Sequence, residues 1–209
     1  RIGETILGQA FALGPGGKGS NQAVAVGRLG VPVALITRLG NDAFAETARA
    51  TWAEAGVTPV VTRVPESYTG AAFIFVEEGT GDNAIIIAPG AAATITPADL
   101  DAQAALIAGA AVFVTQLEQP LDAAVRGLAI AREAGVTTIL NPAPAAALPD
   151  ETLALCDYLT PNETEAEALT GVAIDALDAA RAAAEALIAR GVGTAVITLG
   201  ARGALLHGQ

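Results

Sequence analysis

The second half of the chain alternates short β-rich runs with Ala-rich runs of helical character. The β-rich runs are 111–116, 136–140 and 194–198, and the helical runs among them are 121–134 and 175–190. Strands that alternate with helices form βαβ units, in which the strands are parallel and helices cover both faces of the sheet. Consecutive apolar residues in 112–114 fit such a doubly covered strand. The pattern predicts an α/β fold with a mostly parallel sheet flanked by helices.

Proline and glycine mark the ends of the predicted helices. Pro97 stands where a helix would begin, and a proline at the first helical position loses no hydrogen bond. Gly135 and Gly191 directly follow two of the helical runs, where a glycine commonly ends a helix. These residues support the predicted boundaries.

Between residues 58 and 88 the pattern changes to three short β-rich runs with no helix between them. The runs are 60–64, 71–76 and 84–88, and turn-forming residues separate the second from each of its neighbours. Three strands alone cannot cover both faces of a sheet. We therefore expect a small sheet that lies over the main domain as a lid or pairs with another chain. Its exposed edge predicts a homodimer.

Composition and charge narrow the classes of partner. Hydrophobic residues make up 52% of the chain, but the longest apolar run, 104–114, is too short to span a bilayer, so we expect no membrane segment. The net charge of -11, with only 11 Lys and Arg, argues against nucleic acid as a partner. Cys156 is the single cysteine and predicts a small buried apolar side chain rather than a disulfide. Without a leader-like segment, we expect the protein to be cytoplasmic.

Polar residues follow each predicted strand of the main sheet. In an open parallel sheet, ligands bind beyond the carboxyl ends of the strands. Any one of these residues could be an ordinary turn or cap residue, but together they favour a binding site. The residues are Gln116 and Glu118, Asn141, Asn162 and Glu165, and Thr198 with Gly200.

A glycine-rich segment, GPGGKGSN at 14–21, invites two readings that its context rejects. It matches the G-x-G-x-x-G string of dinucleotide sites, but residues 8–13 are a weak strand. It is not a Walker loop, because Gly19 follows Lys18 and Ala12 stands at the position of the first glycine. A flexible cluster leading into a helix at about 21–29 remains, and its backbone amides could approach a sugar. The alternative is a simple glycine-rich connection.

The string GGKGSNQAVAVGRLG, residues 16–30, resembles the sugar-binding signature of the ribokinase family of PfkB-type carbohydrate kinases. The strings TGDNAIIIAPGA, QLEQPLDA, NPAPAAALPDE, LTPNETEAEALTG and VITLGARGALL follow in the family's order and approximate spacing. The resemblance therefore covers essentially the whole chain. It implies one truncated ribokinase-like domain over 1–209, with about 58–88 contributing to a β lid, and ATP-dependent phosphorylation of D-ribose at its primary 5-hydroxyl.

The resemblance also assigns roles to individual residues. It implies that a small-molecule sugar is bound by Gly16, Gly17, Lys18, Gly19, Asn21 and Glu118. It implies that ATP is bound by Asn162 and by the loop Thr198, Leu199, Gly200, Ala201, Arg202 and Gly203. Glu165 completes an N-x-x-E motif that organises Mg²⁺ in relatives, largely through water. A monovalent cation such as K⁺ is a further implied cofactor.

The chain departs from the family at both ends. Relatives begin with a strand that carries an Asn and an Asp for the sugar, and this chain begins after that point. Their C-terminal third carries a D-T-x-G-A-G-D-type motif with the catalytic Asp, and no such string occurs here. We therefore assign no catalytic residue to this chain and expect residues 1–209 alone to be inactive. The alternatives are a kinase for another sugar or a nucleoside, and a non-catalytic sugar-binding pseudokinase.

Overall fold

The main sheet is mostly parallel, as the alternation of strands and helices predicts. The computed structural model describes residues 7–208. Its largest sheet runs in the order β5-β6-β7-β8-β9. The pairs from β5 to β8 are parallel, and β9 is antiparallel to β8. The strands are β5 (Val112–Thr115), β6 (Thr137–Leu140), β7 (Tyr158–Leu159), β8 (Thr194–Thr198) and β9 (Ala204–Gly208).

Helices connect these strands and bury small side chains against the sheet. In α8 (Leu177–Ala189) the buried residues Ala180, Ala183, Ala184 and Leu187 recur at helical spacing and form one stripe. That stripe belongs to a core cluster that includes residues of β6, β7 and β8. The other helices of this unit are α3 (Pro97–Asp101), α4 (Ala104–Ala108), α5 (Leu121–Glu133), α6 (Asp150–Leu153) and α7 (Glu163–Thr170).

The punctuation by proline and glycine is confirmed. Pro97 is the first residue of α3, within a capping box of Thr96 and Asp99. Gly135 and Gly191 follow α5 and α8 with positive φ angles of 74° and 105°. Both glycines therefore adopt a backbone conformation that other residues rarely take.

A second unit contains β1 (Val33–Leu39) and β2 (Val57–Arg63), which pair in parallel, with α1 (Lys18–Arg28) and α2 (Ala43–Ala55). Its core surrounds Trp52, which is 2% exposed. Asp42 caps the start of α2, and Gly56 ends it with a φ of 73°. This β1–β2 unit carries the glycine-rich segment at the start of α1.

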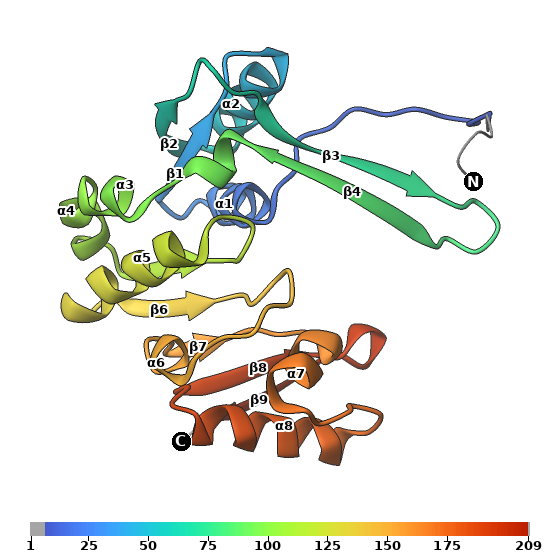
Figure 1. The fold of residues 1–209 in the computed structure, drawn as a ribbon, viewed down its shortest axis with the longest axis vertical. Coiled ribbons are helices and arrows are strands. Elements are labelled where there is room, and N and C mark those ends of the chain that lie inside the picture. The colour runs from blue at the N-terminus through green and yellow to red at the C-terminus, as the bar shows by residue number, and fades with distance from the viewer. Residues whose placement is uncertain (1–6, 209) are drawn as a thin grey trace.

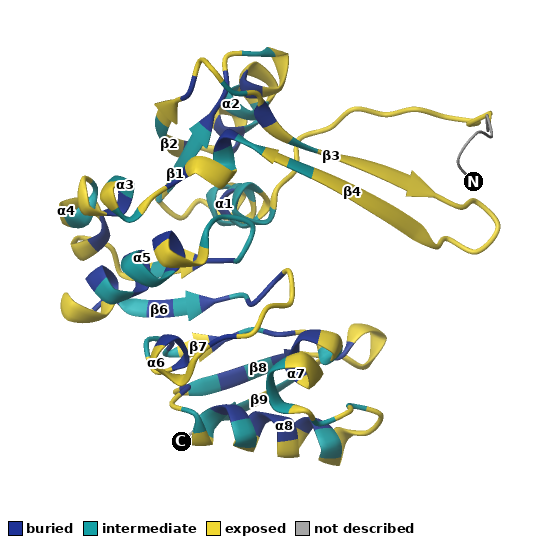
Figure 2. Cartoon of the chain, in the orientation of Figure 1, coloured by how far each residue is buried: buried dark blue, intermediate teal, exposed yellow. Residues whose placement is uncertain are grey.

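The lid is a two-stranded hairpin of β3 (Thr69–Val76) and β4 (Asn83–Gly90). It extends as an arm away from both units, and most of its length is exposed (Figures 1 and 2). The expectation of three lid strands was wrong, because β2 pairs with β1 in the body of the molecule. We call β3, β4 and their connecting turn the lid hairpin.

Helix α1 begins earlier than predicted. It starts at Lys18 rather than near residue 21, so Lys18 and Gly19 lie in its first turn. Glycine has low helix propensity, but contacts with the end of β5, described below, override that preference. Within residues 7–208, no helix combines the length and apolar character needed to cross a membrane.

Candidate functional site

The carboxyl ends of the parallel strands form one rim, held by hydrogen bonds between successive loops. The amide of Asn141 donates to the carbonyl of Thr115 at 3.0 Å, which joins the ends of β6 and β5. The amide of Thr160 donates to the carbonyl of Leu140 at 2.9 Å. The amide of Thr198, at the end of β8, donates to the carbonyl of Pro161 at 2.9 Å. The polar residues predicted to follow the strands are therefore neighbours along this rim.

The glycine-rich segment meets the rim at the end of β5. The amide of Lys18 donates to Oε2 of Glu118 at 2.7 Å. Gly17 precedes α1 with a φ of 89°, a conformation that favours glycine. A Cβ on Gly19 would lie 2.9 Å from Oε1 of Gln116, so a larger residue there would have to displace the Gln116 side chain. The structure thus brings Gly17, Lys18 and Gly19 together with Glu118.

Gly16 and Asn21 lie on the exposed side of this segment. A Cβ added to Gly16 would have no neighbour within 4 Å. Asn21 is exposed, and its amide donates to the carbonyl of Gly17 at 2.8 Å in the first turn of α1. Both residues are therefore accessible to a ligand above the start of α1.

Further polar contacts that sequence reasoning missed fix α1 in place. Nε2 of the buried Gln116 donates to Oε1 of Gln22. The indole Nε1 of Trp52 donates to Oγ of Ser20 at 2.8 Å. Gln22 lies three residues after Gly19, so both residues lie on one face of the helix. This spacing could have indicated that Gln22 faces the same neighbour as Gly19, the end of β5. Nothing in the local sequence pairs Trp52 with Ser20.

The N-x-x-E motif lies at the start of α7 and forms a reciprocal capping box. Oδ1 of Asn162 accepts from the amide of Glu165 at 2.8 Å, and Oε2 of Glu165 accepts from the amide of Asn162 at 2.9 Å. Asn162 also forms an isolated parallel bridge with Thr198. The motif therefore stabilises the helix and at the same time lies beside the predicted nucleotide loop.

The predicted nucleotide loop is a tight turn between β8 and β9. The amide of Leu199 donates to the carbonyl of Gly203 at 2.8 Å, and the turn contains η2 (Gly200–Arg202). Gly200 and Gly203 have φ angles of 56° and 89°, and a Cβ on either would meet nothing within 4 Å. The requirement for glycine here is conformational, and the open space beside the backbone leaves room for a ligand.

The side chain of Arg202 is engaged by the protein. Its guanidinium forms an ion pair with Glu163 at 2.5 Å and donates to the carbonyl of Asp175 at 3.1 Å. Arg202 therefore ties the loop to the start of α7, beside Asn162. Ala201 is exposed in the same turn.

Glu165 has the chemistry of a magnesium ligand, although much of its carboxylate is already used. It is 8% exposed, and Oε2 is bonded to the Asn162 amide. Mg²⁺ is commonly held by one or two carboxylates with waters and substrate phosphates, so a single carboxylate fits the ion. Within residues 7–208, no cluster of three or more His, Cys, Asp or Glu side chains suited to a metal occurs.

The arrangement offers two ligand-binding regions on one rim. The first is the start of α1 with Glu118 at β5, and the second is the β8–β9 turn with the N-x-x-E motif. Three strand spacings separate β5 from β8, or about 14 Å. A polar small molecule bound at the first region and a nucleoside triphosphate bound at the second could therefore meet between the two regions, as group transfer between two bound ligands requires.

A family model described as pfkB family carbohydrate kinase matches residues 2–209. The chain therefore belongs to this family, whose members transfer a phosphoryl group from ATP, and its fold is the ribokinase-like α/β fold.

Similar proteins within the family include sugar kinases with named substrates. The chain is 42% identical over 202 residues to a ribokinase of Haemophilus influenzae, covering 96% of this chain and 66% of that protein. It is 38% identical over 205 residues to a deoxyribokinase of Salmonella typhi, covering 97% and 67%. The structure of Arabidopsis thaliana ribokinase complexed with ribose and ATP superposes with a TM-score of 0.88 at 29% identity, covering 100% of this chain and 68% of that one.

Proposed function

We propose that this protein is an ATP-dependent ribokinase that phosphorylates D-ribose on its primary 5-hydroxyl. The observation that carries the proposal is the shared rim, where Lys18 and Glu118 lie at one end and Asn162 and Thr198 at the other. The frequent ribokinase names among relatives at about 40% identity support the choice of sugar. Since the chain spans 66% of the length of the Haemophilus relative, the proposal concerns the intact protein.

The sugar region would bind hydroxyl groups through fixed donors and acceptors. Glu118 is held by the Lys18 amide through Oε2, which leaves Oε1 to accept from a sugar hydroxyl. Charged acceptors form stronger hydrogen bonds than neutral ones, so Glu118 would contribute much of the sugar affinity. The Lys18 side chain and Asn21 would add donors above the first turn of α1.

The nucleotide region would hold the phosphates beside the sugar. Gly200 and Gly203 let the backbone of the loop approach ATP, and Arg202 fixes the loop through Glu163. Glu165, with Asn162, would hold Mg²⁺ largely through water. When bound, the ion would neutralise charge on the phosphates, which is a large part of catalysis in phosphoryl transfer. A monovalent cation such as K⁺ is a further proposed cofactor.

The lid hairpin would cover the sugar and exclude water. Residues directly opposite in an antiparallel pair share a face, so Phe73 pairs with Ile86 on one face and Ile74 with Ile85 on the other. All of these side chains are more than half exposed. One apolar face would close over the sugar, and we propose that the other packs against a second copy in a homodimer. Sedimentation of the Phe73→Asp and Ile74→Asp variants tests the proposed dimer. At least one of the two variants should sediment as a monomer.

The choice of sugar is tested with the intact protein. We expect kcat/KM for D-ribose to exceed that for 2-deoxy-D-ribose, D-fructose and adenosine. A deoxyribokinase is the second candidate, because the Salmonella relative is 38% identical over 97% of this chain. A larger kcat/KM for the deoxy sugar would select that alternative, and no turnover with any of them would favour a pseudokinase. Because ATP is the proposed donor, we propose that the reaction takes place in the cytoplasm.

We further propose that residues 1–209 alone do not catalyse phosphorylation of the sugar. The D-T-x-G-A-G-D-type motif of the family is not within them. Losing a general base costs about 10² to 10⁴ in rate. A coupled assay for ADP on this chain, beside the intact protein, tests the proposal, and ribose-dependent turnover by the 209 residues would contradict it.

A further inference from the structure

The lid hairpin is attached to the body at the end of β1, over residues 38–42. The backbone there is crowded: a Cβ on Gly40 would lie 2.5 Å from the carbonyl oxygen of Ser67. Two charged residues of this segment, Arg38 and Asp42, contact the chain on either side of the hairpin. Neither residue belongs to the sugar or nucleotide regions described above.

Asp42 holds the strand that enters the lid. Its Oδ2 accepts from the amide of Thr69, the first residue of β3, at 2.7 Å. Its Oδ1 accepts from the amide of Ala45 at 2.9 Å and so caps α2. The hydroxyl of Thr69 in turn accepts from the amide of Gly40 at 3.1 Å. The bond from Thr69, followed by that from Ala45, lowers the pKa of Asp42.

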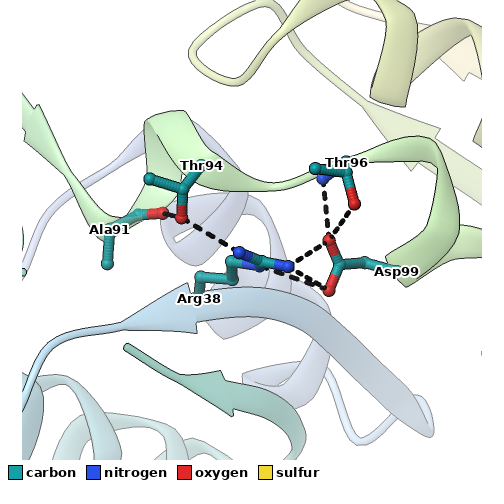
Figure 3. Close-up of polar contacts among 5 residues, drawn as sticks. All are labelled: Arg38, Ala91, Thr94, Thr96 and Asp99. Carbon is teal, nitrogen blue, oxygen red and sulfur yellow. Dashed lines mark hydrogen bonds and ion pairs between the residues drawn. The ribbon is translucent and has the colours of Figure 1, made fainter. Parts of the chain in front are cut away.

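Arg38 holds the chain that leaves the lid. Its Nη2 donates to both carboxylate oxygens of Asp99 at 2.8 Å, and its Nη1 donates to Oγ1 of Thr94 at 3.2 Å (Figure 3). Oγ1 of Thr94 donates to the carbonyl of Ala91, and Oδ2 of Asp99 accepts from the amide of Thr96 at 2.7 Å. A single guanidinium thus organises the whole connection from η1 (Ala91–Thr94) to α3.

The two attachments meet at the base of the hairpin. The amide of Ala91 donates to the carbonyl of Tyr68 at 2.8 Å, which joins the residues just outside β3 and β4. Beyond that bond lie Gly70 and Gly90, where a Cβ would come within 2.6 Å and 2.3 Å of backbone oxygens. Outside its base, most of the hairpin is exposed (Figure 2). Close backbone packing therefore surrounds the base of the hairpin at these glycines.

We propose that Arg38 and Asp42 are positioning residues that form the seat of the lid, holding both of its ends so that the hairpin can close over the sugar. This inference rests on the proposed function. A seated hairpin spends a larger fraction of its time in the closed geometry, and apparent sugar affinity scales with that fraction. Neither residue needs to touch the sugar to have this effect.

The test is Arg38→Ala in the intact protein, with Arg126→Ala as the matched control. Arg126, on α5, pairs with Asp101 of α3, the helix that also carries Asp99, but both side chains of this control pair are substantially exposed. We expect the KM for ribose to rise about tenfold in Arg38→Ala while kcat changes less than about twofold. Arg38→Lys, which keeps the charge but not the bidentate geometry, should recover part of the affinity. Asp42→Asn should raise KM in the same way.

A purely structural role predicts a different result. Loss of folded protein would lower apparent kcat and leave KM unchanged, and that outcome would overturn the proposal. An equal rise of KM in Arg126→Ala would overturn it as well.

A second measurement needs no enzymatic activity. Hydrogen exchange should accelerate at the amide of Thr69 in Asp42→Asn, and at those of Ala91 and Thr96 in Arg38→Ala, while β6 and β8 stay protected. If the unsubstituted protein phosphorylates no sugar, the proposed function fails, and exchange alone decides whether the seat exists. Unchanged exchange at these amides would refute the seat.

Discussion

A substitution of Gly27 by alanine tests how closely α1 packs on α2. Gly27 lies near the end of α1, and a Cβ there would stand 2.2 Å from the carbonyl oxygen of Ala55 and 3.3 Å from Cγ2 of Val57. The obstacle is backbone at the end of α2, so no side-chain rotation can relieve the contact. The helices must move apart, and this loosens the core around Trp52.

Two opposing terms set the expected magnitude. Alanine is favoured over glycine inside a helix by about 1 kcal/mol. Forcing an extra group into a packed core costs about 1 to 3 kcal/mol, and the upper end applies where backbone must shift. The net loss should be about 2 kcal/mol, which corresponds to a fall in Tm of roughly 4 to 8 °C for a chain of this size.

Thermal unfolding followed by circular dichroism measures this loss against two controls. Gly14→Ala should be nearly neutral, because nothing lies within 4 Å of its Cβ. Gly127→Ala should cost less than Gly27→Ala, because its close neighbour is the Phe113 ring at 2.5 Å, a side chain that can shift. A Tm for Gly27→Ala equal to or above that of the unsubstituted chain would refute the packing argument.

Three further predictions concern single groups. Burial, followed by the charge of Asp157, raises the pKa of Cys156 to about 12, so its thiol should not react with a thiol reagent at pH 8 until the protein is unfolded; reaction in the native state would contradict this. Burial alone would raise the pKa of Asp99, but bonds from Arg38 and Thr96 outweigh it, so the pKa is lowered, as it is for Asp42. Both carboxylates therefore stabilise the fold at pH values above their ordinary pKa of about 4, and this stability should be lost as the pH falls through the lowered folded-state pKa values. The urea concentration at the unfolding midpoint should then decrease as the pH is lowered below about 4. A midpoint that stays constant over that pH range would argue against this contribution. Glu118→Ala in the intact protein should raise the KM for ribose about tenfold or more, and a KM within twofold of the original would remove Glu118 from the sugar site.

The sequence was most informative where local pattern and burial agree. The run at 194–198 coincides with β8, and the helical runs at 121–134 and 175–190 match α5 and α8 within two residues at each end. Both helices are rich in alanine, which favours helix and packs closely on a sheet. The polar strand ends could be placed on one rim because parallel strands expose their carboxyl ends together.

Strand pairing could not be predicted in the same way. The sequence of β2 is rich in Val and Thr, which is typical of any strand. Its parallel partner lies 24 residues earlier, as in the pairing of Val33 with Val57. Nothing in the local sequence shows that β2 pairs with this earlier strand rather than with the hairpin that follows it. The start of α1 also depends on distant residues. Glu118 accepts the Lys18 amide across 100 positions of sequence, and this contact lets a glycine-rich segment become helical.

The Asn162–Glu165 pair shows why a cap and a binding motif are not exclusive explanations. The two side chains satisfy each other's backbone amides, so the box alone accounts for their spacing. The same capping box positions Asn162, which forms a β-bridge with Thr198. Arg202, in the adjacent β8–β9 turn, forms an ion pair with Glu163. Capping α7 therefore fixes the loop that is proposed to receive ATP. A residue selected for helix stability at this position would serve the ligand site through the same hydrogen bonds.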